Sequence, residues 1–407
     1  MNILQLAPQV PYPLSDGGKV GIFNITKHLA LRGHRITLLA FQRTKPIDTK
    51  PLERFCELVQ IPHSNRNSMS GALLNLFSEE PYNIWKYRSR KYEAALRQLL
   101  DKRPFDVVHV DHLHMARYGA LCRHSAGLPI VLREHNVEST IVKRYAATAR
   151  SIPFRHWLTL QERRIRSYEA EQATLYDVCC VITDEDKQRL LELAREARVK
   201  VIAGGVDASF FEITPSEQKI PFSISMFGSF DWRPNRDALE WFLQSIFPRI
   251  LQREPQVRLF IVGKDVPRNV RGLHQSNVVV RGFADNLKEE LQKYDLTVVP
   301  LRIGGGMRLK ILESFAMRIP VVSTSIGCEG IACKDEEHLL IGDTEELFAD
   351  QVVRLLNDSA LRESLVDNAY ALADAKYRWE TIAQEFETTY QDVVRNRKQR
   401  EYRGDAS

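Results

Sequence analysis

Short apolar runs rich in β-branched residues alternate along the chain with longer segments whose apolar positions recur every three or four residues. The runs lie at 2–7, 35–41, 58–62, 105–110, 128–133, 178–183 and 199–203, and again at 222–227, 258–262, 277–281 and 296–300. Such runs are typical of buried strands, and the periodic segments between them are typical of amphipathic helices. Strands that alternate with helices predict an α/β fold with parallel sheets.

A linker divides the chain near its middle. The segment GGVDASFFEITPSEQK at 204–219 contains glycines, a proline and a polar tail, which favour a connection over a helix or strand. The 407 residues are enough for two Rossmann-sized halves. We therefore expect two α/β domains.

The most informative stretch runs from Leu296 to Thr324. An apolar strand is followed by three consecutive glycines at 304–306, by a periodic segment that predicts a helix at about 307–317, and by a second strand at 320–323. Bare amides at the start of a helix receive anions, and the helix dipole adds partial positive charge. Arg308 and Lys310 reinforce that charge. The pattern predicts a phosphate cradle.

Lys310 and Glu313 are three residues apart, so they share one face of the predicted helix. A diphosphate attached to a ribose suits this pair, because the cation binds the phosphates and the carboxylate accepts hydrogen bonds from two hydroxyls. The alternative is an exposed salt pair beside an ordinary glycine loop.

A second glycine turn follows the first strand of the chain. Gly17 and Gly18 are expected to turn the backbone before a helix at about 20–32. This arrangement either approaches a ligand or is a plain first strand-to-helix turn of an open sheet. It is not a dinucleotide fingerprint, because the Gly-x-Gly-x-x-Gly spacing is missing.

Two strands of the first half end in polar side chains. The strand at 105–110 leads into a histidine-rich group, and the strand at 128–133 leads into Glu134, His135, Asn136 and Glu138. In open α/β sheets, ligands bind beyond the carboxyl ends of strands, so we expect His135 to contact a substrate. The alternative is a histidine that caps the next helix. The first group contains His109, Asp111, His112 and His114. We favour one cleft-facing residue there over a metal site, because neighbouring residues of a strand alternate between faces.

Charged clusters elsewhere have simpler interpretations. Asp184, Glu185 and Asp186 come just before a helix predicted at 187–197, where acids cap free amides, so we prefer capping to a metal-binding Asp-x-Asp. The segment 140–176 is predicted to be helical and is strongly basic, with aromatic residues between the cations. It either lies on an anionic bilayer or is a solvated face.

The net charge is +5 and the sequence pI is about 8.8. This mildly basic balance permits an acidic substrate or an anionic membrane, but no basic module typical of nucleic-acid binding is present. The six cysteines lack metal-ligand spacing, which favours free thiols in a reducing compartment. We find no signal-peptide pattern and no membrane-spanning run, and we expect a cytoplasmic protein.

The segment GGGMRLKILESFAMRIPVVSTSIGCEGI resembles the donor-binding segment of the retaining glycosyltransferases of family 4. That family has the GT-B fold, with two facing Rossmann-like domains and an interdomain cleft. Glu313 matches the second glutamate of the family's paired motif, which holds the nucleotide ribose. Gly305 stands where the first glutamate, usually credited with contacting the donor sugar, is expected.

The resemblance implies an N-terminal acceptor domain at 1–205, a donor domain at 206–377, and a last helix at about 378–396 that packs back on the first domain. It aligns His135 with a histidine near the reacting sugar and brings the turn at 17–18 toward the donor phosphate. Turns at 263–264 and 282–283 are expected to border the nucleotide, the second of them its base.

The family clamps the diphosphate with an arginine just after a glycine that matches Gly228, but Ser229 stands in that place here. The remaining cations are Arg233, Arg236, Arg308 and Lys310. We expect Arg308, Lys310 and His135 to be catalytic. Donor or nucleotide contacts are expected from Gly17, Gly18, Gly228, Arg233, Gly263, Gly304, Gly305, Gly306 and Glu313.

The resemblance implies a retaining hexosyltransferase that uses a nucleotide-diphosphate sugar without a metal or other cofactor. The acceptor would be a glycan or a lipid-linked acceptor, in glycan, exopolysaccharide or glycolipid biosynthesis. The basic region 140–176 would touch an anionic membrane from its inner face, and no nucleic acid is expected as a partner. Two alternatives stay open, namely a sugar-nucleotide epimerase of the same fold and a non-catalytic sugar-nucleotide-binding protein.

Overall fold

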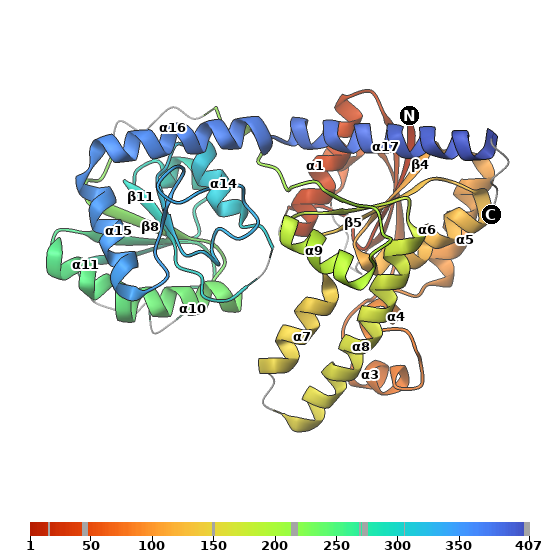
Figure 1. The fold of residues 1–407 in the computed structure, drawn as a ribbon, viewed down its shortest axis with the longest axis horizontal. Coiled ribbons are helices and arrows are strands. Elements are labelled where there is room, and N and C mark those ends of the chain that lie inside the picture. Colours follow the sequence, from red (N-terminus) through yellow and green to blue (C-terminus); the bar gives the residue numbers. More distant parts are fainter. Residues whose placement is uncertain are drawn as a thin grey trace. The chain divides into compact units, whose positions relative to one another are not determined.

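Two compact units make up the computed structural model, which describes residues 1–14, 17–42, 48–148, 151–212, 219–267, 270, 276–304 and 306–402. One unit comprises Met1–Ala203 with Ile382–Ser407, and the other comprises Gly204–Thr381. The last helix, α17 (Trp379–Tyr402), begins in the second unit and continues in the first (Figure 1). We retain 1–205 and 206–377 as a prediction of the domain limits.

The first unit is built on a sheet of seven parallel strands in the order β3-β2-β1-β4-β5-β6-β7. The strands are β1 (Asn2–Ala7), β2 (Arg35–Gln42), β3 (Glu57–Pro62), β4 (Val107–Asp111), β5 (Ile130–Glu134), β6 (Val178–Val181) and β7 (Val199–Val201). Because β1 pairs with both β2 and β4, the strand order reverses at β1. In such sheets this is where ligands bind.

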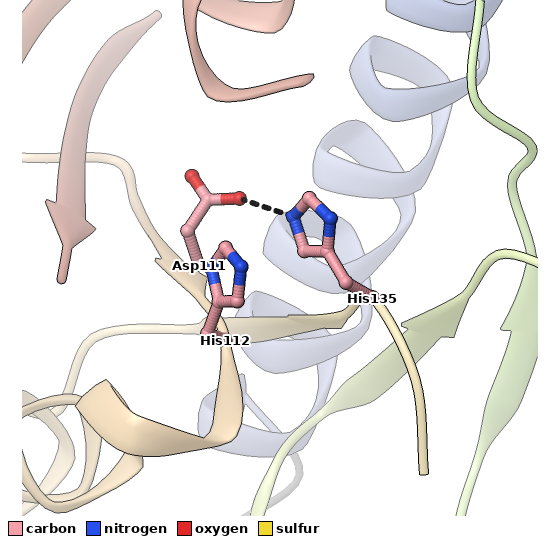
Figure 2. Close-up of side chains that lie close together, drawn as sticks. All are labelled: Asp111, His112 and His135. Carbon is pink, nitrogen blue, oxygen red and sulfur yellow. Dashed lines mark ion pairs between the residues drawn. The ribbon is translucent and has the colours of Figure 1, made fainter. Parts of the chain in front are cut away.

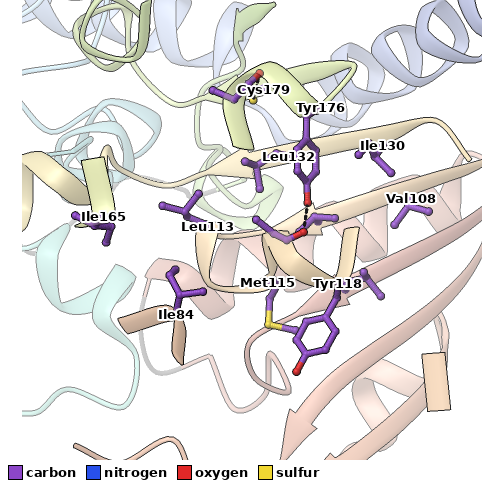
Figure 3. Close-up of a cluster of buried hydrophobic side chains, with 14 of the residues drawn as sticks. Ile84, Val108, Leu113, Met115, Tyr118, Ile130, Leu132, Ile165, Tyr176 and Cys179 are labelled. Carbon is purple, nitrogen blue, oxygen red and sulfur yellow. Dashed lines mark hydrogen bonds between the residues drawn. The ribbon is translucent and has the colours of Figure 1, made fainter. Parts of the chain in front are cut away.

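The helices of this unit are α1 (Gly17–Leu31), α2 (Lys50–Glu53), α3 (Met69–Asn75), α4 (Tyr82–Trp85), α5 (Arg90–Lys102), α6 (Ala116–Ala126), α7 (Glu138–Thr148), α8 (Ile152–Leu175) and α9 (Asp184–Leu193). A 3-10 turn spans Leu113–Met115. On one side of the sheet, the apolar faces of strands and helices meet in a large core cluster (Figure 3). At its centre, the hydroxyl of Tyr176 donates to the carbonyl oxygen of Ala116 at 2.7 Å, which satisfies a polar group that the core buries.

Two predicted details of this unit were wrong. Gly17 and Gly18 do not form a turn, because α1 begins at Gly17 and includes both. Helix α9 begins at Asp184, three residues before the predicted start at 187, because the hydroxyl of Thr183 accepts a hydrogen bond from the amide of Asp186 and caps the helix. The N-cap is thus Thr183 and not one of the acidic residues, which lie in the first turn, where the helix dipole favours negative charge as expected.

The second unit has a sheet of six parallel strands in the order β10-β9-β8-β11-β12-β13. The strands are β8 (Ser223–Phe227), β9 (Arg258–Val262), β10 (Val278–Gly282), β11 (Leu296–Val299), β12 (Val321–Ser323) and β13 (Leu340–Ile341). Its helices are α10 (Arg233–Trp241), α11 (Phe247–Arg253), α13 (Leu287–Leu291), α14 (Leu309–Ala316), α15 (Glu345–Asn357) and α16 (Ser359–Lys376), with a π-helical turn at Phe242–Ile246.

The two parallel sheets with helices between their strands confirm the α/β prediction. Gly205 shows why glycine follows β7, since a Cβ there would lie 2.7 Å from the buried ring of Trp379. Within the described part of the chain, every helix is too short or too polar to span a bilayer.

Candidate functional site

The glycine loop lies between β11 and α14. Gly304 and Gly306 have φ values of 140° and 76°, which favour glycine. A Cβ at position 304 would also lie 2.5 Å from a guanidinium nitrogen of Arg308. Gly305 lies outside the described residues, so its predicted contacts are not located.

Arg308 is the N-cap residue of α14 and is 5% exposed. Its side chain turns back on the loop: NH1 donates to the carbonyl oxygen of Gly306, and the guanidinium carbon lies 5.8 Å from the ring centroid of Trp232. In this structure Arg308 therefore braces the glycine loop. A contact between Arg308 and a phosphate stays a prediction.

Lys310 lies in the first turn of α14 and reaches the carboxyl end of β8. Its Nζ atom donates hydrogen bonds to the carbonyl oxygen of Phe227 at 2.8 Å and to Oδ1 of Asn235 at 3.0 Å. Two glycines allow this approach. A Cβ at Gly228 would lie 3.0 Å from Nζ, and a Cβ at Gly263 would lie 1.8 Å from the carbonyl oxygen of Gly228.

Burial gives Lys310 and Glu313 unusual acidities. It lowers the pKa of Lys310 to about 8, an effect that Glu313 opposes and Arg308 reinforces. Burial likewise raises the pKa of Glu313 to about 7, which Lys310 opposes. Both charged forms are poorly solvated, so an anion near the lysine and hydroxyl donors near the carboxylate would each stabilise them. This is the chemistry that a phosphorylated ribose offers.

Asn235 is a member of this site that sequence reasoning missed. It is buried on α10, and its amide nitrogen donates to the carbonyl oxygen of Ser229 at 2.8 Å. The sequence feature that could have indicated it is a polar residue on the same helical face as Ala238 and Leu239, which are both buried. Arg233 and Arg236 are exposed on the same helix, and the structure gives neither a contact with Lys310 or Glu313 among the described residues.

A cavity of about 470 Å³ lies beside the turns that follow β9 and β10. It is lined by Gly263, Lys264, Asp265, Val266, Val280, Arg281, Gly282 and Phe283. The ring of Phe283 is 61% exposed, and Nζ of Lys264 lies 4.5 Å from its centroid. The structure thus brings together the two turns expected to border the nucleotide.

In the first unit, His135 follows β5 and lies beside the end of β4 (Figure 2). Its ring stacks on His112 with centroids 3.9 Å apart and an interplanar angle of 11°. Arg133 NH1 lies 2.5 Å from His135 Nε2 and 3.2 Å from Asp111 Oδ1. A Cβ at Gly21 would lie 2.8 Å from Arg133, so α1 packs closely against this group.

The electrostatics of this group follow from burial. Burial lowers the pKa of His135 to about 4, and Arg133 adds to the effect. Burial alone would raise the pKa of Asp111, but His109, His135 and Arg133 together hold it well below its ordinary range. The imidazole is therefore neutral at pH 7 and the carboxyl is ionised.

Asp111, His112 and His135 each offer one possible metal-ligand atom, and these atoms lie within 4.8 Å of one another. The guanidinium of Arg133 contacts two of these residues, and its positive charge opposes a cation there. Stacked parallel rings also direct their nitrogen lone pairs side by side rather than toward one ion. The absence of a metal here stays a prediction, which the charge of Arg133 and the ring stacking support.

Glu134 and Glu138, which flank His135, belong to a carboxyl cluster with Glu169 on α8. Glu169 accepts hydrogen bonds from the amide of Glu138 at 2.7 Å and from the hydroxyl of Ser139 at 2.5 Å. Burial raises the pKa of Glu134 well above its ordinary value and raises those of Glu138 and Glu169 to about 7. The hydrogen bonds of Glu169 therefore hold the start of α7 in place.

Comparison with known proteins places this chain among sugar-transferring enzymes. Residues 15–210 match the family model described as Glycosyltransferase Family 4, and residues 221–358 match the model described as Glycosyl transferases group 1. Over 420 aligned residues the chain is 25% identical to N-acetyl-alpha-D-glucosaminyl L-malate synthase of Bacillus anthracis, covering 95% of this chain and 97% of that protein.

Two solved structures share the fold. Sucrose-phosphate synthase from Thermosynechococcus elongatus aligns with a TM-score of 0.70 at 18% identity, over 97% of this chain and 100% of that one. Anabaena HepE in complex with UDP-glucose aligns with a TM-score of 0.64 at 16% identity, over 96% and 100%. Both models describe glycosyltransferases and together they match most of the chain, so the chain belongs to the glycosyltransferases and has the GT-B fold.

Proposed function

We propose that the protein transfers a sugar from a nucleotide-diphosphate sugar to an acceptor hydroxyl, with retention of the anomeric configuration. The observation that carries the proposal is the pair formed by Lys310 and Glu313 on α14. Burial lowers the pKa of the first and raises that of the second, so each is poised for a ligand of complementary chemistry.

The donor would lie along the glycine loop and the adjacent turns. The diphosphate would contact the loop amides and Lys310, and Glu313 would accept hydrogen bonds from the ribose hydroxyls. The base would enter the cavity beside Phe283, whose exposed ring offers a stacking surface. Anabaena HepE binds UDP-glucose, which makes a uridine nucleotide the first donor to test.

Catalysis would come from stabilising the leaving group. Negative charge grows on the leaving diphosphate, and donors already held in position by the fold stabilise it without reorganisation. Lys310 is held in this way by Phe227 and Asn235. In a front-face reaction the leaving phosphate itself accepts the proton of the acceptor hydroxyl. The family resemblance assigns His135 a contact with the transferred sugar, and it assigns Gly17 and Gly18, which begin α1, an approach to the donor phosphate.

A turnover assay with a panel of sugar nucleotides tests this function. The purified protein is incubated with UDP-, GDP- and ADP-sugars, with and without a mixture of glycan acceptors. Acceptor-dependent nucleotide release, with a product whose anomeric configuration matches that of the donor, supports retaining transfer. An altered sugar still attached to its nucleotide would instead show epimerisation, and binding without turnover would show a non-catalytic protein.

We further propose that the region 140–176 contacts an anionic membrane together with α3. On α3 and just beyond it, Met69, Leu73, Leu74 and Phe77 are between 60% and 93% exposed. Helix α3 is held against α8, where Arg164 donates to the carbonyl oxygens of Asn75 and Leu76. On α7 and α8 the exposed cations include Lys143, Arg144, Arg155, Arg163 and Arg166.

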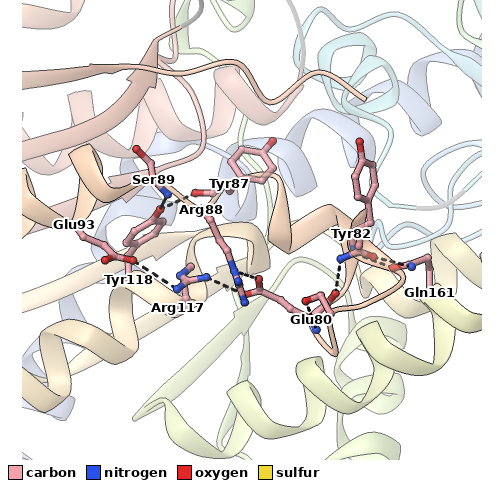
Figure 4. Close-up of polar contacts among 11 residues, drawn as sticks. Glu80, Tyr82, Tyr87, Arg88, Ser89, Glu93, Arg117, Tyr118 and Gln161 are labelled. Carbon is pink, nitrogen blue, oxygen red and sulfur yellow. Dashed lines mark hydrogen bonds and ion pairs between the residues drawn. The ribbon is translucent and has the colours of Figure 1, made fainter. Parts of the chain in front are cut away.

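Polar contacts fix the segment that carries this surface (Figure 4). Glu80 accepts from Arg88 at 2.5 Å and from Arg117 at 3.1 Å, and the amide of Tyr82 donates to Gln161 at 2.8 Å. The segment that carries the exposed apolar side chains is therefore held in place by these polar contacts. Exposed apolar groups beside cations suit the interfacial region of an anionic bilayer.

A further inference from the structure

The contact between Arg133 and His135 determines which imidazole nitrogen carries the proton. NH1 of Arg133 lies 2.5 Å from Nε2 of His135. A guanidinium group has only hydrogen-bond donors and stays protonated in proteins. Nε2 must therefore accept this hydrogen bond, and the proton of a neutral His135 must reside on Nδ1.

Arg133 is itself held rigidly by Asp111. One carboxylate oxygen, Oδ1, lies 3.2 Å from Arg133 NH1. The other, Oδ2, accepts from Gln5 Nε2 at 2.8 Å and lies 3.2 Å from Nε2 of His109. Gln5, Asp111 and Arg133 are each at most 2% exposed, so water does not compete for these contacts.

The carboxylate of Asp111 raises the pKa of His135, but less than burial and Arg133 lower it. Asp111 Oδ1 lies 3.9 Å from His135 Nε2, which is too long for a hydrogen bond. The two groups therefore form a loose ion pair, in which Arg133 rather than Asp111 makes the short contact with Nε2. Burial and the neighbouring guanidinium lower the pKa of His135 to about 4, which keeps the ring neutral.

The other nitrogen keeps access to solvent. His112 Nδ1 and His114 Nδ1 are both buried and without a hydrogen-bond partner in the described chain. Nδ1 of His135 is not among such buried atoms. The His135 side chain is 12% exposed. No described residue accepts a hydrogen bond from its Nδ1, so this N–H is available to a ligand.

We propose that His135 serves the transfer reaction as a neutral hydrogen-bond donor through Nδ1–H, and that Arg133 is the positioning residue that fixes this tautomer. The hydrogen bond to a substrate rests on the proposed function, but the tautomer of His135 can be measured without any substrate. Within this scheme His135 is not a general base, because its unprotonated nitrogen is occupied by Arg133.

Nitrogen-15 NMR of the histidine side chains of the full chain tests the tautomer directly. His156 and His63 supply internal references: Nδ1 of His156 lies 2.9 Å from a carbonyl oxygen, and Nε2 of His63 lies 2.8 Å from another. Carbonyls only accept, so these nitrogens carry protons. His135→Asn identifies the His135 signals. We expect a neutral ring with Nδ1–H at pH 7, and a neutral ring with Nε2–H would overturn the proposal.

Two Arg133 variants test the positioning role. In Arg133→Lys a cation and donor remain, so the Nδ1–H pattern should persist. In Arg133→Met the donor is lost, and an Nε2–H population should appear at His135 while His63 and His156 are unchanged. An unaltered His135 pattern in a folded Arg133→Met protein would show that Arg133 does not set the tautomer.

Two isosteric substitutions of His135 test whether Nδ1–H donates a hydrogen bond during transfer. They remain informative if Arg133→Met fails to fold. Asn places an amide nitrogen near the former Nδ1, whereas Gln places it near the former Nε2. His135→Asn should retain at least about tenfold more kcat/KM than His135→Gln, the difference expected for one directed hydrogen bond. Equal losses, or the reverse order, would contradict donation from Nδ1. If the native protein transfers no sugar, the proposed function is wrong, but the tautomer found by NMR is unaffected.

Discussion

Oδ1 of Asn235 accepts a hydrogen bond from Nζ of Lys310 at 3.0 Å, across 75 residues of sequence. The same amide donates to the carbonyl oxygen of Ser229 at 2.8 Å. Asn235 thus connects the lysine of α14 to the loop that follows β8. The lysine is therefore held in position before any donor binds.

Replacing Asn235 should weaken donor binding. Asn235→Ala removes one of the two described partners of Lys310, a bond worth about 1 kcal/mol, so the dissociation constant for the donor nucleotide should rise roughly fivefold. Isothermal titration calorimetry measures this. Glu240→Ala, on the same helix, is the matched control and should leave the affinity unchanged. An equal effect of both substitutions would point to general disturbance of α10.

The plot of kcat/KM against pH should be a narrow bell-shaped curve. Binding needs Glu313 ionised and Lys310 charged. Activity should therefore rise as pH increases through about 7, where the carboxyl loses its proton, and fall as pH increases through about 8, where the lysine does. Initial rates at low donor concentration across this range measure the profile. In Glu313→Gln the acidic limb should disappear, and its persistence would assign that limb to another group.

The same shift has a consequence for folding stability. The folded-state pKa of Glu313 lies above its ordinary value, so its contribution to stability is fully present at low pH and is lost as pH rises through about 7. Glu313→Gln removes this cost and should be relatively more stable than the native protein at pH 8 than at pH 5. Urea unfolding at the two pH values measures the difference. A stability difference that does not change with pH would contradict the burial of an ionisable Glu313.

Gly263 should tolerate no side chain. Its φ of 143° disfavours other residues, and a Cβ would lie 1.8 Å from the carbonyl oxygen of Gly228. Gly263→Ala should lower the midpoint of thermal unfolding and weaken nucleotide binding, with backbone strain of about 1–3 kcal/mol before the clash is added. Gly33→Ala is the control, because Gly33 also has positive φ but has open space around it. Similar losses in both variants would mean that the contact with Gly228 contributes nothing.

Membrane contact should depend on the exposed apolar residues near α3. Leu73→Ser combined with Phe77→Ser removes two highly exposed apolar side chains and should reduce co-sedimentation with vesicles containing phosphatidylglycerol. Leu31→Ser, at an exposed leucine of α1, should not. Binding should also fall with rising salt, because the cations of α7 and α8 contribute. Unchanged binding of the double variant would show that this surface does not enter the bilayer.

Periodicity was sufficient to predict most of the fold, because strands such as β1 and β11 are short and mostly apolar runs. The loop at Gly304 and the shared face of Lys310 and Glu313 could also be predicted, since both depend on local spacing. The bend of Arg308 back onto Gly306 could not, because it depends on the conformation of the glycine loop.

Contacts between distant elements explain the other differences. The group of Asp111, Arg133 and His135 comes from two strands that pair in the sheet, and no spacing rule indicates which strand ends meet. Asn235 reaches Lys310 through tertiary packing alone. The carboxyl cluster around Glu134 could not be foreseen either, because its third member, Glu169, lies on α8, 35 residues further along the sequence.

Calorimetric titration of Lys310→Ala and Glu313→Ala with a nucleoside diphosphate and its 2′-deoxy analogue shows whether these two side chains hold the phosphates and the ribose, with Arg318→Ala as an exposed control. We predict that Lys310→Ala weakens binding of both nucleotides by at least about tenfold, as expected for loss of a charged hydrogen bond. The native protein should prefer the ribonucleotide, and Glu313→Ala should lose this preference. Native affinity in Lys310→Ala, or an intact ribose preference in Glu313→Ala, would contradict these roles.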